Sequence, residues 1–131
     1  MDPRLRNFFD LQLEEVLQRL PQRVHDLLAE VPLFVEDYPP QSVLAKLGLT
    51  HRDQLCGLYT GVPLDARSGF DAPQMPDVVT IYREGILNMA AGDADGLTES
   101  KLQRQIHITV LHELGHHHGL DEDELDDLGY G

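Results

Sequence analysis

His112, Glu113 and His116 are the residues of this chain whose types and spacing are best suited to chemistry. An α-helix repeats about every 3.6 residues, so side chains four positions apart lie on the same face. In a helical segment, both imidazoles can therefore reach one metal ion. Glu113 is turned by about a quarter of a circle from His112, which places its carboxylate beside that ion. The spacing predicts a metal site with a carboxylate next to it.

The pattern His-Glu-x-x-His is the arrangement of zinc hydrolases. Catalytic zinc takes three protein ligands and keeps one position open for water or substrate. With zinc held by His112 and His116, Glu113 is placed to accept a proton from the water that attacks a carbonyl group. We therefore expect metal-assisted hydrolysis, with Zn²⁺ as cofactor and Glu113 as the catalytic residue.

The third ligand is expected in the acidic segment that follows Gly119. A glycine just past a helix end readily adopts the left-handed conformation that turns the chain back. Counting three residues from Gly119, as in the metzincin-like pattern, gives Glu122. Asp123, one position later, is the alternative. Because twelve residues follow Gly119, we expect the site to be completed within this short segment.

The run from Thr109 to Glu122 resembles the signature of the small bacterial zincin-like metallopeptidase family. The family usually has an aspartate where this chain has Glu122, and often an aromatic residue where it has His118. The resemblance implies a minimal zincin fold, a zinc ion and peptidase activity on a peptide or protein substrate. It covers nearly the whole chain, because further stretches are similar to the family at residues 34–39, 58–64 and 75–83.

The elements that must position these residues can be predicted from apolar spacing. Apolar residues between Phe9 and Leu20 recur at helical intervals, which predicts a first helix. A second helical stretch runs from Pro21 to Glu30. Short helices are also predicted at residues 42–47 and 86–91. Short apolar or β-branched runs bounded by Pro, Gly or Asp predict three strands, at Leu33–Glu36, Leu58–Thr60 and Val78–Tyr82.

The motif itself lies on a predicted helix from Glu99 to His118. Ser100 and Gln103 resemble a capping box near its start. An apolar stripe beside the histidine face is expected to be buried, and it consists of Leu102, Ile106, Val110 and Leu114. The fold class is therefore α+β, with N-terminal helices, a small mixed sheet of about three to four strands and a C-terminal active-site helix. An exposed edge at residues 58–60 or 78–82 would align a peptide substrate.

Length and composition favour a single domain over residues 1–131, since 41% hydrophobic residues suffice for one core. The formal charge of −13 disfavours nucleic acids and anionic membranes as partners. Cys56 is the only cysteine, so no intrachain disulfide can form. With no apolar run suited to a signal peptide or a membrane span, we expect a cytoplasmic protein. The sequence leaves the oligomeric state open.

Three other interpretations of the motif compete with the enzyme. In a zinc-binding interaction module without activity, the same ligands would pin the acidic C-terminal segment onto the core. Such a structural site gains nothing from the carboxylate of Glu113 and would have its fourth position closed by protein. A histidine-rich helix end that is merely solvated is the simplest alternative. Metal-dependent RNA hydrolysis is disfavoured by the acidic charge and by the lack of a third motif histidine.

Overall fold

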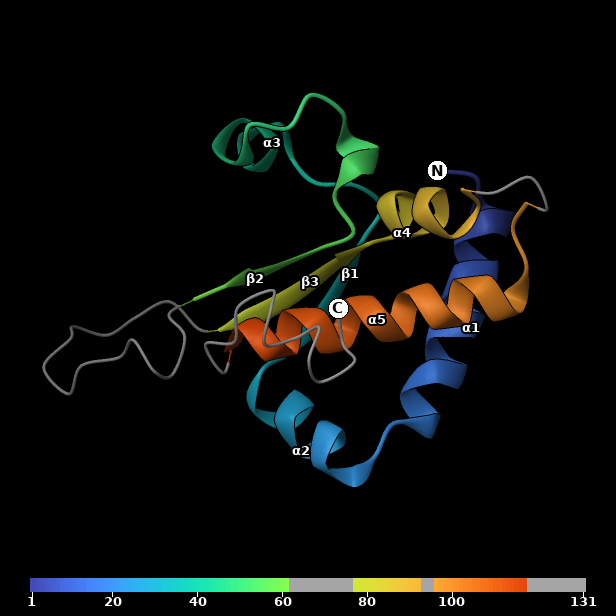
Figure 1. Ribbon diagram of the computed structural model, residues 1–131, viewed down its shortest axis with the longest axis vertical. Helices are drawn as coiled ribbons and strands as arrows, with labels where there is room; N and C mark the ends of the chain where they lie inside the picture. The colour runs from blue at the N-terminus through green and yellow to red at the C-terminus, as the bar shows by residue number, and fades with distance from the viewer. Residues whose placement is uncertain (62–76, 93–95, 118–131) are drawn as a thin grey trace, which may run out of the picture.

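The computed structural model of the chain describes residues 1–61, 77–92 and 96–117. Within these ranges the helices and strands follow one another as predicted in type (Figure 1). No helix in the described ranges is long and apolar enough to cross a membrane. The elements are α1 (Pro3–Arg19), α2 (Gln22–Glu30), β1 (Leu33–Glu36), α3 (Gln41–Leu47), the 3₁₀ turn η1 (Arg52–Gln54), β2 (Gly57–Thr60), β3 (Val78–Tyr82), α4 (Arg83–Ala90) and α5 (Glu99–His117).

The three strands form one mixed sheet in the order β1-β3-β2. Strand β1 runs parallel to β3, and β2 runs antiparallel to it. The central strand is therefore β3, and β2 is an edge strand among the described residues. This arrangement confirms the predicted α+β class with a small mixed sheet, and it selects residues 57–60 over residues 78–82 as the available edge.

Helix α5 lies along one face of the sheet, where α1 crosses it and α4 packs beside it (Figure 1). Its predicted apolar stripe is buried, with Leu102, Ile106 and Val110 fully excluded from solvent and Leu114 at 2% exposure. Burying one such side chain stabilises a fold by about 1.5–3 kcal/mol. The same helix that carries the motif thus forms the centre of the core, together with Phe9, Leu13, Val16, Val79, Ile81 and Ile86.

The prediction that Ser100 and Gln103 cap the motif helix is wrong. The Thr98 hydroxyl accepts a hydrogen bond from Lys101 N at 3.2 Å, which makes Thr98 the N-terminal cap. Ser100 lies inside the first turn of α5, where it cannot cap the helix. The side chain of Gln103 instead links α5 to α1, because its amide donates a hydrogen bond to Gln12 Oε1 at 2.6 Å.

A network of charged side chains joins α1, the segment after β1 and the start of α4. Arg83 Nε donates to Asp10 Oδ1 at 2.9 Å, and Arg83 Nη1 donates to Asp37 Oδ1 at 3.0 Å. Arg6 donates to the same Asp37 carboxylate from a second side, at 2.6 Å. The guanidinium of Arg83 also lies 5.8 Å from the centre of the Phe9 ring. These contacts fix α4 against α1 at the end of the sheet.

Candidate active site

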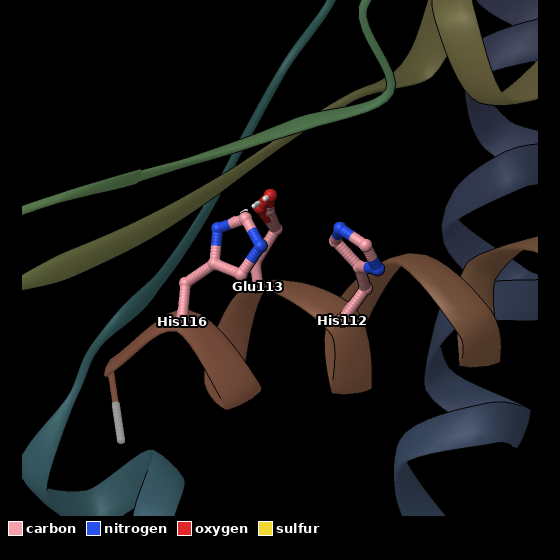
Figure 2. A group of neighbouring side chains, drawn as sticks. All are labelled: His112, Glu113 and His116. Atoms are coloured by element: carbon pink, nitrogen blue, oxygen red, sulfur yellow. Dashed lines mark ion pairs between the residues drawn. The ribbon is translucent and has the colours of Figure 1, made fainter. Parts of the chain in front are cut away.

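His112, Glu113 and His116 project from the same side of α5, toward the strands (Figure 2). The two histidines are half-buried, whereas Glu113 is 7% exposed. Helical spacing produces this arrangement, since residues three and four positions apart on a helix are neighbours. The structure thus brings the three predicted residues together on one face, with the carboxylate deepest.

The three side chains are close enough to act on one ion. Their candidate ligand atoms all lie within 4.8 Å of one another. The rings of His112 and His116 have centroids 4.7 Å apart and are tilted by 55°. His116 Nδ1 lies 3.9 Å from Glu113 Oε1, the contact dashed in Figure 2. Ligand atoms around a tetrahedral zinc ion are about 3.4 Å apart.

The chemistry of these donors fits zinc. Imidazole nitrogens and a carboxylate oxygen are ligands that Zn²⁺ accepts, and two histidines on one helix supply two of the three protein ligands of a catalytic site. His112, Glu113 and His116 can therefore hold a metal ion.

Strand β2 lies against the stem of the Glu113 side chain. Its first residue, Gly57, packs against the aliphatic stem of Glu113 and against Thr109 one turn earlier on α5. Sequence reasoning did not single out Gly57, because the predicted strand began at Leu58. A glycine at a strand start is nevertheless a signal of close backbone approach.

The negative charge of Glu113 contributes to raised pKa values in two neighbouring groups. Burial, and to a lesser extent the Glu113 carboxylate, raises the pKa of the Cys56 thiol to about 11. Burial also raises the pKa of the Tyr82 phenol, with smaller contributions from Glu36 and Glu113. Both groups are therefore neutral at physiological pH. Neither group adds a charge beside the carboxylate.

The other predicted residues of the site fall outside this group. Glu122, the expected third ligand, and its alternative Asp123 lie outside the described residues. Three other histidines lie away from this group: His25 is on α2, His51 precedes η1, and His107 is exposed on α5.

Comparison with known protein families agrees with this geometry. A family model described as Zincin-like metallopeptidase matches residues 28–131. The chain belongs to the zincin-like metallopeptidase family. The matched region of this family contains all three strands and α5 with its motif, whereas α1 lies before it. A search of curated proteins finds no match to the chain. Membership of a zincin family implies zinc as the cofactor, in agreement with the donors that the structure brings together.

Proposed function

We propose that this protein is a zinc-dependent peptidase in which His112 and His116 hold the metal and Glu113 is the general base. The observation that carries the proposal is the burial of a carboxylate between two half-exposed histidines on one helix face, beneath an edge strand. Family membership supports the same reaction class. We further propose Glu122 as the third protein ligand, with Asp123 as the alternative.

Bound zinc would acidify water and polarise the carbonyl group of the substrate. The task of the protein side chains is to hold the metal and to move protons. In this scheme a Glu113 carboxylate oxygen accepts a proton from the attacking water and passes it to the leaving amine. Because Glu113 is buried against the sheet, bulk water has little access to this proton, and the carboxylate needs no large rearrangement before it reacts.

The proposed substrate is a peptide bound in extended conformation along β2. An extended peptide can add to an exposed sheet edge through main-chain hydrogen bonds. Strand β2 pairs with β3 on one side, and no described residue pairs with its other side. The edge begins at Gly57, directly above Glu113. The charge of −13 favours neutral or basic peptides over acidic ones.

The variant Glu113→Gln distinguishes a zinc-dependent peptidase from a zinc-binding module that has no activity. The variant keeps the size of the side chain and both histidines, so the protein is expected to keep binding zinc. Cleavage of a peptide library by the zinc-loaded protein, followed by mass spectrometry, is expected to fall by about 10²–10⁴-fold. His112→Ala is the matched control and should lose zinc as well as activity. Folded, zinc-loaded wild type that cleaves no peptide would reject the enzyme and favour the module.

A further inference from the structure

Gly57 occupies a position at which a side chain would collide with the proposed general base. A Cβ atom added there would lie 3.0 Å from Glu113 Cγ and 2.9 Å from Thr109 Cγ2. It would also lie 3.3 Å from the Thr80 carbonyl oxygen. Carbon atoms in favourable contact are about 3.5–4.0 Å apart, so any larger residue at position 57 must displace a neighbour.

The start of β2 is held from two sides and cannot easily move away. The amide of Tyr82 donates a hydrogen bond to the Cys56 carbonyl at 2.8 Å, immediately before the strand. Helix α4 packs so closely against the backbone of Leu55 that its Gly85 has no room for a Cβ atom. A side chain at position 57 would therefore press on α5 more readily than it would lift β2.

The side chain of Thr109 is also held in one orientation by hydrogen bonds. Its hydroxyl donates to the Gln105 carbonyl at 2.8 Å and accepts from Gln105 Nε2 at 3.4 Å. This back-bond and the stiffness of a β-branched side chain leave the Thr109 methyl group pointing at Gly57. Of the side chains in contact with position 57, Glu113 has the greatest torsional freedom, since its stem has further rotatable bonds.

We propose that Gly57 is a positioning residue for Glu113. The missing side chain lets the Glu113 stem lie directly beneath the edge strand and keeps its carboxylate 3.9 Å from His116 Nδ1. One backbone position thereby sets the distance between the proposed base and the strand that would align the peptide. This inference rests on the proposed peptidase function, and it adds a residue that acts through Glu113 without touching the reacting atoms.

Gly57→Ala is the direct test. Because a misplacement of about 1 Å can cost about 10²-fold in rate, we expect kcat to fall by about 10–100-fold. KM, and zinc affinity measured by calorimetry, should each stay within about threefold, since the three atoms nearest the added methyl group belong to Thr109, Glu113 and Thr80 rather than to either histidine. A crystal structure of the variant should show Glu113 in a different rotamer with β2 in place.

Two further variants separate positioning from general damage. Ile86→Val removes one methyl group from a fully buried core residue on α4 and should lower Tm while leaving kcat unchanged. Adding Thr109→Ser to Gly57→Ala removes the methyl group that meets the new side chain, so Tm should recover while kcat stays low. Recovery of kcat together with Tm, or an unchanged Glu113 rotamer in Gly57→Ala, would overturn the positioning role. Inactive zinc-loaded wild type would instead reject the peptidase function.

Discussion

The Arg83 guanidinium donates a hydrogen bond to Asp37 at 3.0 Å, although 46 residues separate the two in the sequence. The Arg83 side chain is 13% exposed and also binds Asp10 on α1. Three segments that are distant in the chain thus meet at one planar cation. Guanidinium groups suit this role because their donors are arranged in a rigid fork that matches carboxylates.

Replacing Arg83 by methionine should destabilise the fold by about 2–3 kcal/mol, because Asp10 and Asp37 would each lose a charged partner in a partly buried site. Urea unfolding monitored by circular dichroism measures this loss. Arg19→Met is the matched control. Arg19 pairs with Glu15 at 3.2 Å, but its side chain is 70% exposed, and such pairs contribute about 0–1 kcal/mol. Equal losses in the two variants would contradict the role assigned to Arg83.

Asp37 should make stability depend on pH in the acid range. The hydrogen bond from Arg6, with further help from Arg83, holds the pKa of Asp37 below its ordinary value of 3.8. The folded state therefore favours the ionised form. This contribution is complete above the unfolded pKa and is lost as pH falls through the lower folded pKa. The difference in unfolding free energy between wild type and Asp37→Asn should shrink below about pH 4; a constant difference would argue against the ion network as its cause.

Zinc should stabilise the folded protein through the two histidines. A ligand at 100 times its dissociation constant adds about 2.7 kcal/mol to the free energy of unfolding when it binds only the native state. Differential scanning calorimetry should show Tm rising with zinc concentration in the wild type. His112→Ala and His116→Ala should each remove most of this rise, whereas Glu113→Gln should keep it. A rise that persists in both histidine variants would place the metal elsewhere.

The pKa of the Cys56 thiol should depend on the charge of Glu113. Because burial and that charge together raise the thiol pKa to about 11, alkylation by iodoacetamide should be slow at pH 8 in the zinc-free protein. In Glu113→Gln the thiol pKa should fall, while burial, the larger cause, keeps it above the ordinary value of 9.0. The pH dependence of the alkylation rate gives both values. Identical profiles for the two proteins would mean that Glu113 does not act on Cys56.

The predictions from sequence succeeded where local pattern decides the outcome. The stripe from Leu102 to Leu114 follows the helical period, and the strands are short β-branched runs between turn-forming residues, so neither needs long-range information. The grouping of His112, Glu113 and His116 has the same origin. Element ends were less accurate: α4 begins at Arg83, before the predicted residue 86.

Contacts between distant segments were not predicted, because a single sequence does not show which residues meet. The hydrogen bond from Gln103 to Gln12 on α1 is one such contact, and it uses a side chain that the sequence had assigned to a helix cap. The close approach of Gly57 to Glu113 depends on how β2 crosses α5. The third metal ligand stays a prediction, since Glu122 and Asp123 lie outside the described residues.

Helix α5 packs against α1, α4, β2 and β3, and this position limits how the protein can diversify. One face of α5 is buried in the core and a neighbouring face carries the three motif side chains, so few changes on these two faces are neutral. The exposed side of β2 has no such commitment among the described residues. If the proposed peptidase function holds, selectivity for different peptides would evolve along the edge strand while the helix and the proposed chemistry stay constant.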